Sequence, residues 1–257
     1  MLPKKTIQNI RQLHLKKFRD EQQLFIVEGD KSCLELLKSS IVTREVFATA
    51  AWIESHIEEL KNVNYYQVNE KEMERISCLT TPQQVLAVAE CPIFHLNDLD
   101  MTQPLLVLDT LRNPGNLGTI IRAADWFGFR QILCTETCVE FTNPKTIQAS
   151  MGSFTRVKIA YANPIPYLAE AKERQIFGMA MEGEPLPKLS FGDNDIFVIG
   201  SESHGISPEI NALIETHLHI PNYTNTQDKA ESLNVSIAAS VMMYDFCAKK
   251  EGGKVFL

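Results

Sequence analysis

The sequence predicts an α/β protein with two domains, and three features support this prediction. The chain has 257 residues, which is enough for two domains with separate cores. Short apolar runs alternate with helical stretches along most of its length. A segment with two prolines and no regular period, residues 91–104, interrupts this pattern. We therefore predict one α/β domain over residues 1–90, a linker over 91–104 and a second α/β domain over 105–257.

The amino-terminal domain is predicted from four strand-like runs. The first is LFIVEG (24–29), which ends in a glycine, and DKSCLELLKSS after it has apolar residues at helical spacing. The runs EVFAT, NYYQV and QVLAVAE repeat the strand pattern, with helical patterns around residues 51–60 and 69–77. Strands that alternate with helices are typical of an α/β domain.

The second domain begins with a continuous apolar run, PLLVLDTL (104–111). Such a run is typical of a parallel strand that is buried on both faces. Further strand candidates are RQILC (130–134), RVKIA (156–160), QIFGMAM (175–181), DIFVIGSE (195–202) and THLHIPN (216–222). The amphipathic segment SLNVSIAASVMMYDFCAKK predicts a long helix at the end of this domain.

Composition narrows the class of protein. Hydrophobic residues make up 44% and charged residues 22%, as in ordinary globular proteins. No apolar run approaches the roughly 20 residues that span a bilayer, and the basic amino terminus is not followed by the apolar core of a secretory signal. We therefore expect a cytoplasmic protein without membrane contact. Only Cys134 and Cys138 of the six cysteines lie close together, without a second pair nearby, so we expect reduced thiols and no metal.

The charge of the chain is distributed unevenly. A net charge of −7 argues against a protein that coats nucleic acid without specificity. Six basic residues nevertheless precede the first acidic residue, Asp20: Lys4, Lys5, Arg11, Lys16, Lys17 and Arg19. These residues either form a solvated helix face or contact phosphate groups.

A first polar loop lies within LDTLRNPGNLGTIIRAADWFGF (108–129). We expect a strand that ends at Asp109, a glycine-containing turn over 113–116 and a helix from about Leu117. Unpaired backbone amides at a helix start favour anions. Asn116 would lie near this start and Arg122 one to two turns along the helix. The loop is either a nucleotide cradle or a glycine turn with a surface arginine, and it lacks the G-x-G-x-x-G dinucleotide fingerprint.

A second polar loop lies within DIFVIGSESHGISPEI (195–210). An apolar strand leads into Gly200 and Gly205, and Pro208 is expected to begin a helix. Glycines let the backbone approach a ligand closely, and ligands of open α/β sheets bind at the carboxyl ends of strands. Glu202 either accepts a hydrogen bond from a bound group or caps the turn. His204 is either a base or a solvent-facing loop residue.

A third polar loop lies within HIPNYTNTQDKAESLNVSIAASVMMYDF (219–246). We expect the helix after it to be capped near Ser232, which would place Asn234 inside its first turn. Asparagine is unfavourable in a helix interior, and ligand binding is one reason for its presence there. The small residues that follow allow close packing of backbone or ligand: Ser236, Ala238, Ala239 and Ser240.

Together these loops resemble the three motifs of the SpoU (TrmH) family of RNA 2′-O-ribose methyltransferases, in the SPOUT superfamily. NLGTIIR is similar to the first motif, VIGSESHGIS to the second and IPNYTNTQDKAESLNVSIAAS to the third. The resemblance implies a parallel-sheet SPOUT domain with a deep trefoil knot over residues 105–257. More weakly, FIVEGDKSCLELL and TPQQVLAVAE resemble the smaller α/β substrate-binding domain that precedes many such domains. The knot is implied by the resemblance alone, because chain connections usually avoid threading.

The resemblance also implies a reaction, the transfer of a methyl group from S-adenosylmethionine to a ribose 2′-hydroxyl of RNA. The additional amino-terminal domain favours ribosomal RNA over transfer RNA as the substrate. Arg122 matches the arginine that has been proposed as general base, although a guanidinium keeps its proton up to a pH above about 12. The alternative is a substrate phosphate that bridges a charged Arg122 to the hydroxyl. The polar positions that would hold the arginine and the ribose are Asn116, Glu202, Ser232 and Asn234.

Cofactor, RNA and partner residues follow from the same resemblance. The backbone of Gly200, Ile220 and Leu233 would contact the cofactor, and a loop with Ala180, Met181 and Gly183 would close over it. RNA would be bound by the basic residues of the amino-terminal domain: Lys4, Lys5, Arg11, Lys16, Lys17, Arg19 and Lys31. The family forms homodimers through the carboxy-terminal domain. Val241, Met242 and Tyr244 suit either this interface or the core.

Two other functions are compatible with parts of this pattern. A non-catalytic RNA-binding or ribosome-assembly protein could keep the fold, but it would not need all of the matched polar residues. A nicotinamide dehydrogenase would need a glycine fingerprint and an acidic residue about 20 positions later. Neither follows the predicted strand at 105–109.

Overall fold

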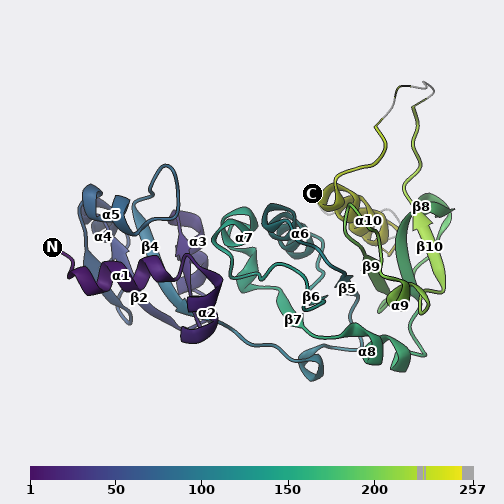
Figure 1. The fold of residues 1–257 in the computed structure, drawn as a ribbon, viewed down its shortest axis with the longest axis horizontal. Coiled ribbons are helices and arrows are strands. Elements are labelled where there is room, and N and C mark those ends of the chain that lie inside the picture. Colours follow the sequence, from purple (N-terminus) through teal and green to yellow (C-terminus); the bar gives the residue numbers. More distant parts are fainter. Residues whose placement is uncertain (225–227, 229, 251–257) are drawn as a thin grey trace. The chain divides into compact units, whose positions relative to one another are not determined.

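The computed structural model in Figure 1 describes residues 1–224, 228 and 230–250. The chain forms two compact units. Unit 1 contains Met1–Ile93 together with Glu140–Arg156, and unit 2 contains Phe94–Val139 together with the chain from Val157 onward. Each unit is an α/β structure with its own sheet, so the predicted α/β class is confirmed.

Unit 1 is built on a four-stranded sheet with the order β1-β4-β2-β3. The central strand β4 runs antiparallel to both neighbours, whereas β2 and β3 run parallel. The four predicted runs form these strands: β1 (Leu24–Glu28), β2 (Thr43–Ala48), β3 (Asn64–Gln67) and β4 (Val85–Glu90).

The amino-terminal helix α1 packs on one face of this sheet. The helices of unit 1 are α1 (Lys4–Gln12), α2 (Lys16–Gln22), α3 (Asp30–Leu37), α4 (Ala50–Ser55), α5 (Glu70–Ile76) and α7 (Pro144–Ser150). Ile7 and Ile10 of α1 share a hydrophobic cluster with Ile76 of α5. Glu72 of α5 accepts hydrogen bonds from the backbone amides of Leu2 and Asn69, which ties the start of α1 to α5. This packing turns the basic residues of α1 toward solvent.

Residues 140–156 complete unit 1 from the middle of the chain. The ring of Phe25 packs against those of Phe141 and Phe154, with centroids 6.1 and 5.8 Å apart. Arg19 of α2 is only 2% exposed, pairs with Glu140 and donates to the Leu13 carbonyl at 2.8 Å. The prediction that Arg19 contacts phosphate is therefore wrong, because its charge is buried and already paired.

Unit 2 is built on a six-stranded sheet with the order β10-β8-β9-β5-β6-β7, in which all neighbours run parallel. Strands β5, β6 and β9 are buried along their full length, as their continuous apolar runs predict. The strands are β5 (Leu105–Leu108), β6 (Gln131–Cys134), β7 (Lys158–Tyr161), β8 (Ile176–Pro185), β9 (Ile196–Ile199) and β10 (Thr216–His219). The predicted parallel-sheet domain, with a smaller α/β domain before it, is thus confirmed.

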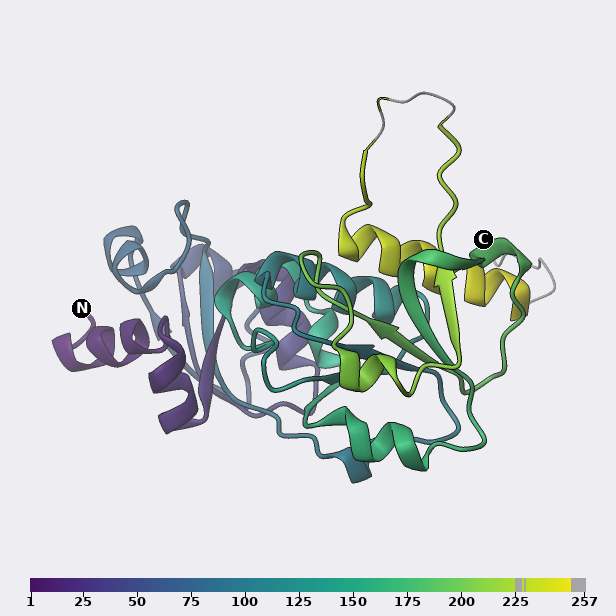
Figure 2. The same ribbon diagram turned by 45° about the vertical axis from the view of Figure 1, so that its right-hand side comes forward.

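Helices cover both faces of this sheet (Figures 1 and 2). On one face, α8 (Pro164–Glu170) and α9 (Pro208–Asn211) bury Leu168 and Ile210 against Val198. On the other, α10 (Val235–Lys250) packs Phe246 against Phe129 and Phe197, with ring centroids 5.1 and 5.4 Å apart. Helix α6 (Pro114–Trp126) lies beside α10, where the rings of Phe127 and Tyr244 are 6.3 Å apart. None of the helices in the described part of the chain has the length and hydropathy that crossing a membrane requires.

Two helix starts differ from the prediction, and asparagine capping explains both. Helix α6 begins at Pro114 and not near Leu117, because Asn113 Oδ1 accepts from the amides of Gly115 and Asn116 at 2.9 and 3.2 Å. Helix α10 begins directly after Asn234, whose Oδ1 accepts from the Ser236 amide at 2.9 Å. Asn234 therefore caps α10 and does not lie inside its first turn, and Ser232 lies before the cap.

Most of the predicted linker packs on unit 2. Phe94 and Leu96 join the hydrophobic cluster around Leu99, which is 6% exposed. The buried guanidinium of Arg174 donates to the Gln103 carbonyl at 2.9 Å. Residues 94–103 are thus held by apolar and polar contacts within this unit.

Candidate active site

The three polar loops leave the unit 2 sheet at its carboxyl edge. The first follows β5, the second follows β9 and the third follows β10. Because all six strands run parallel, their carboxyl ends lie along one edge of the sheet. This edge is where α/β proteins bind ligands, so its polar side chains are candidates for the site.

Two hydrogen bonds join one side chain from each loop. Asn116 Nδ2 donates to Glu202 Oε1, and Asn234 Nδ2 donates to Asn116 Oδ1 at 3.1 Å. The partners are 86 and 118 residues apart in the sequence. The fold thus brings together three residues that the sequence singles out, and we call them the amide–carboxylate chain.

Asn234 has a fixed orientation because both ends of its amide are used. Its Oδ1 accepts from the amide and hydroxyl of Ser236 at 2.9 and 2.6 Å, so its Nδ2 is directed to Asn116. Capping alone explains an asparagine at this position, whereas the second bond ties the start of α10 to α6. Ser232 is exposed and bonds to none of the described residues.

Arg122 lies on α6 and is exposed. Within the described part of the chain its guanidinium forms no hydrogen bond or ion pair, so the amide–carboxylate chain does not hold it. Trp126 lies one turn further along α6 and is 84% exposed. Arg122 is thus accessible to an anionic group on this face of the helix.

The loop after β9 is closed tightly on itself. Ser201 and Gly205 exchange backbone hydrogen bonds of 3.0 and 2.9 Å, and Gly205 has a φ of +66°. A Cβ at Gly200 would lie 2.1 Å from the carbonyl carbon of Gly205, so only glycine fits there. The turn presents Glu202 at its tip. His204 is exposed and bonds to the adjacent Ser203 at 2.7 Å, which fits the solvent-facing alternative.

Strand β8 changes register close to this loop. It pairs with β10 up to Gly178 and again from Glu184, and residues 179–183 between these registers are skipped. Its pairing with β9 ends at Gly178. The segment with Ala180, Met181 and Gly183, which we predicted to be a loop, therefore lies inside β8 and forms a bulge between two stretches of pairing.

The bulge ends the pairing between β8 and β9 close to the carboxyl end of β9. The Ile199 carbonyl accepts from the Asp109 amide at 2.9 Å on the β5 side, and Gly200 follows as the first residue after β9. On the other side of the bulge, His219 Nδ1 lies 2.8 Å from the Gly183 carbonyl, and Ile220 follows directly. The bulge and the third loop carry the exposed apolar side chains of Met181 and Leu233, a type of side chain that lines nucleoside sites.

An exposed apolar surface covers the adjoining faces of α6 and α10. Its members are Trp126, Ile237, Val241 and Tyr244, which are 84%, 53%, 36% and 58% exposed. Met242, by contrast, is fully buried. Val241, Met242 and Tyr244 each suited either a dimer interface or the core. Met242 belongs to the core, whereas Val241 and Tyr244 lie on the surface.

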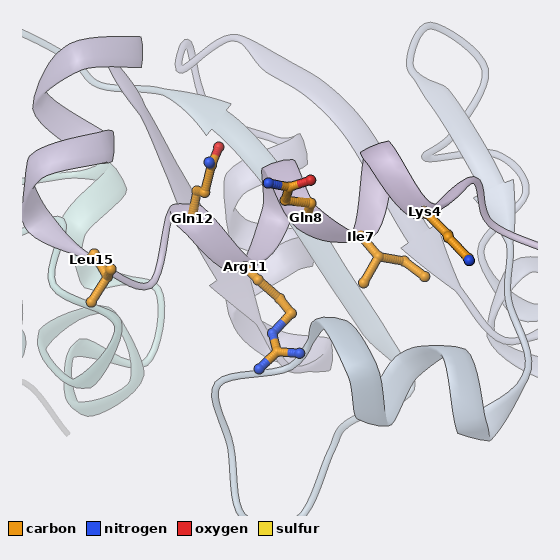
Figure 3. A pocket seen from close by; sticks show the side chains of 6 residues that line it. All are labelled: Lys4, Ile7, Gln8, Arg11, Gln12 and Leu15. Carbon is orange, nitrogen blue, oxygen red and sulfur yellow. The ribbon is translucent and has the colours of Figure 1, made fainter.

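The exposed basic residues that were predicted to bind RNA fall into two classes. On α2, Lys16 pairs with Asp20 at 2.8 Å and Lys17 with Glu21 at 3.8 Å. On α1, no acidic partner within the described residues neutralises the exposed cations Lys4, Lys5 and Arg11, and the same holds for Lys31 on α3. A shallow groove runs along α1, and Figure 3 shows the side chains that line it: Lys4, Ile7, Gln8, Arg11, Gln12 and Leu15.

The cysteines of the site region are thiols. The described residues include no group of three or more histidine, cysteine or acidic side chains that could hold a metal ion. Cys138 is a free, mostly buried cysteine behind the first loop. A hydrogen bond with Cys134 lowers the pKa of the Cys138 thiol to about 7 and raises that of Cys134. Cys138 Sγ accepts from the Leu111 amide and donates to the Leu108 carbonyl, both at 3.2 Å, so this thiol faces the loop backbone.

Comparison with known proteins identifies relatives of both units. Residues 103–244 match the SpoU rRNA Methylase family, and residues 4–87 match the MRM3-like substrate binding domain. RlmP of Bacillus subtilis, named as a 23S rRNA guanosine-2′-O-methyltransferase, is 28% identical over 93% of this chain and 94% of its own. A TrmH-family structure from Porphyromonas gingivalis is 33% identical, with a TM-score of 0.84 over 96% of this chain and 98% of that chain. An AdoMet-bound rRNA methyltransferase from Sinorhizobium meliloti is 25% identical, with a TM-score of 0.84 over 97% and 96%.

Proposed function

The chain belongs to the SpoU rRNA methylase family, and from this premise we propose that it methylates the 2′-hydroxyl of a nucleotide in ribosomal RNA. It is an S-adenosylmethionine-dependent RNA methyltransferase. The observation that carries the proposal is the amide–carboxylate chain, which joins Asn116, Glu202 and Asn234 at the carboxyl edge of the sheet. RlmP of Bacillus subtilis and the mitochondrial rRNA methyltransferase 3 of Mus musculus, which match 93% and 89% of this chain, are named for ribosomal RNA, which favours this substrate over transfer RNA.

The cofactor supplies a methyl group that is activated on a sulfonium sulfur. In our proposal the backbone of Gly200, Ile220 and Leu233 binds the cofactor beyond the carboxyl ends of β9 and β10. The β8 bulge, with Ala180, Met181 and Gly183, covers it. Exposed apolar side chains in these segments would exclude water from the methyl group, and the deep trefoil knot that the resemblance implies would hold the segments in place.

Arg122 has a binding role in this proposal. A guanidinium keeps its proton at physiological pH, so a charged Arg122 would bind a phosphate beside the target ribose. That phosphate would bridge the charged guanidinium to the 2′-hydroxyl and hold its oxygen in line with the methyl group, and the hydroxyl proton would pass to solvent. Asn116, Glu202, Ser232 and Asn234 would orient the ribose, since a fixed alignment of oxygen and methyl group is the main requirement of the reaction.

A homodimer completes the proposed enzyme. The exposed apolar surface of α6 and α10 is suited to an isologous contact, and Arg122 lies one turn from Trp126 on it. Substitution of Tyr244 by glutamate should give a monomer in sedimentation measurements, whereas Tyr65→Glu on the exposed edge strand β3 should not. A monomeric wild-type protein would contradict this part of the proposal.

Unit 1 would bind the RNA. We assign phosphate contact to Lys4, Lys5, Arg11 and Lys31, which no acidic side chain within the described residues neutralises. The paired Lys16 and Lys17 would contribute less. An enzyme that modifies ribosomal RNA works where ribosomes are assembled, which for the bacterial relative RlmP is the cytoplasm, and we propose the same location here.

Labelled methyl transfer tests the function directly. The protein is incubated with S-adenosylmethionine and, separately, with unmodified ribosomal RNA and transfer RNA. Label should enter ribosomal RNA, and alkaline hydrolysis should release it as a dinucleotide, because a 2′-O-methyl group protects the adjacent linkage. RNA binding without transfer to either substrate would instead favour a non-catalytic assembly factor. Transfer to a base would contradict the assignment of the 2′-hydroxyl.

A further inference from the structure

One non-glycine residue has an unusual backbone conformation directly before the first motif. Thr110 has a φ of +54°, in the left-handed region that is unfavourable for residues with a Cβ and most of all for β-branched ones. Two other described non-glycine residues have positive φ, Gln23 and Met151, and both lie at helix ends, where this conformation is common. Thr110 instead follows strand β5, so a helix end does not explain it.

Side chains from the segment after β6 hold this bend. The Thr110 amide donates to Thr135 Oγ1 at 2.9 Å, and the Leu111 amide donates to Cys138 Sγ at 3.2 Å. The Val139 amide donates to the Leu111 carbonyl at 2.8 Å. Thr135 is 8% exposed and its own amide bonds to the Leu108 carbonyl at 3.0 Å, so its hydroxyl is held at a fixed place.

The bend also lies between two parts of the site. Asp109, just before it, accepts a hydrogen bond at Oδ2 from the Ser207 amide at 2.7 Å, which joins it to the loop after β9. Asn113, just after it, caps α6 and so fixes where Asn116 begins to project. The direction of the chain at Thr110 therefore determines whether Asn116 meets Glu202.

We propose that Thr135 is a positioning residue for methyl transfer, whose hydroxyl oxygen holds the left-handed bend at Thr110 and thereby places Asn116 against Glu202. This inference rests on the proposed function and deepens it. Strained backbone conformations of this kind persist where the surrounding structure over-determines them and are concentrated at functional sites. Thr135 acts through the bend and does not touch the substrate.

Thr135→Val tests the proposal because it removes the acceptor and keeps the branched shape. The variant should lose at least about tenfold in kcat, while KM for RNA and Kd for S-adenosylmethionine stay within about twofold. Thr135→Ser keeps the hydroxyl and should restore kcat. The control is Thr137→Val. Thr137 is exposed, and among the described residues its hydroxyl hydrogen-bonds only to Thr135 Oγ1, at 3.0 Å, so kcat should not change.

A second substitution tests the route through the bend. Glycine adopts positive φ without strain, so Thr110→Gly in the Thr135→Val background should recover most of the lost kcat. Loss of kcat that Thr135→Ser or Thr110→Gly does not restore would overturn the proposal. So would a parallel rise in KM and in Kd for the cofactor.

Amide hydrogen exchange separates this inference from the proposed function. Exchange of the Thr110 and Leu111 amides should be at least about tenfold faster in Thr135→Val than in Thr137→Val, whether or not the protein is active. Equal exchange in the two variants would overturn the inference. A wild-type protein that exchanges as expected but transfers no methyl group would contradict the proposed function alone.

Discussion

The polar groups of unit 2 and the cations of unit 1 are held in opposite ways. In unit 2, Asn116, Glu202 and Asn234 bond to one another across 86 and 118 residues of sequence, so their geometry depends on the whole fold. On α1 of unit 1, Lys4 and Arg11 extend into solvent from a single helix, without an acidic partner among the described residues. The first arrangement fixes atoms relative to one another, whereas the second provides charge. Substitutions should therefore change kcat in unit 2 and substrate affinity in unit 1.

The largest effect should come from Arg122→Ala. Loss of a charged donor aimed at the reacting groups lowers kcat by about 10²–10³-fold in comparable sites. Because Arg122 bonds to none of the described residues, the fold should not change. Single-turnover methyl transfer measures the loss, and calorimetry should give an unchanged Kd for S-adenosylmethionine. Arg130→Ala serves as the control: Arg130 lies directly before β6 and pairs with Asp125 of α6.

Arg122→Lys sharpens the same comparison. Lysine keeps the charge but lacks the bidentate fork that matches a phosphate. An intermediate rate would support phosphate binding by a charged Arg122. If the lysine variant were as active as the wild type, the bidentate geometry of the guanidinium would not be required. Position 122 would then act by its charge alone, like the cations of unit 1.

The next effect should come from Asn234→Asp. Aspartate caps a helix as well as asparagine, so α10 should keep its start, and the free energy of unfolding should stay within about 0.5 kcal/mol. The substitution removes the donor to Asn116 Oδ1 and places a carboxylate oxygen there instead. We expect kcat to fall about tenfold or more because the amide–carboxylate chain is broken.

Asn234→Ala provides the contrast. It removes the cap as well as the donor, and loss of such a cap costs about 1 kcal/mol. Urea unfolding of the two variants should therefore differ, while both lose activity. If Asn234→Asp kept full activity, capping would be the whole role of Asn234. The hydrogen bond from Asn234 to Asn116 would then not be needed for methyl transfer.

The sequence predicts more of the sheet than of the site, for a physical reason. Strands β5, β6 and β9 are continuous apolar runs, and burial on both faces allows no other composition. The predicted start of α6 near Leu117 lies after the observed start at Pro114. The local sequence does carry the signal, because Asn113 followed by Pro114 is typical of a cap and a first helical residue. Arg19 could not be assigned locally, because its partner Glu140 lies 121 residues away. The positive φ of Thr110 likewise has no local signal, since threonine rarely adopts it.

In unit 1, the paired and unpaired cations can be compared directly. Lys4→Ala with Arg11→Ala should raise KM for RNA several-fold and leave kcat unchanged. Each lost phosphate contact should reduce the slope of log affinity against log salt by about 1. Lys16→Ala with Lys17→Ala removes the same charge, but Asp20 and Glu21 already neutralise these lysines, so the salt slope should hardly change. Equal slopes for the two pairs would show that charge pairing on α2 is irrelevant to RNA binding.

The smallest effect should come from Glu72→Gln, which tests whether α1 acts only by its charge. Hydrogen bonds from the amides of Leu2 and Asn69 lower the pKa of the Glu72 carboxyl from its ordinary value of 4.5. The ionised carboxylate therefore stabilises the fold at pH values above 4.5, and this stabilisation is lost as the pH falls through the lowered pKa. Glutamine should reduce the free energy of unfolding by about 1 kcal/mol at pH 7, as for other capping contacts. Unfolding followed from pH 7 to pH 3 should also show a weaker acid dependence.

The effect of Glu72→Gln on RNA binding then decides between charge and geometry. Glu72 ties the start of α1 to α5 but contributes no positive charge. If α1 attracts RNA by charge alone, KM should change by less than about twofold, well below the effect of losing Lys4 and Arg11. A rise in KM as large as that of the double variant would mean that the orientation of α1 matters as much as its charge. Unit 1 would then also bind through fixed geometry, and the two units would differ in degree and not in kind.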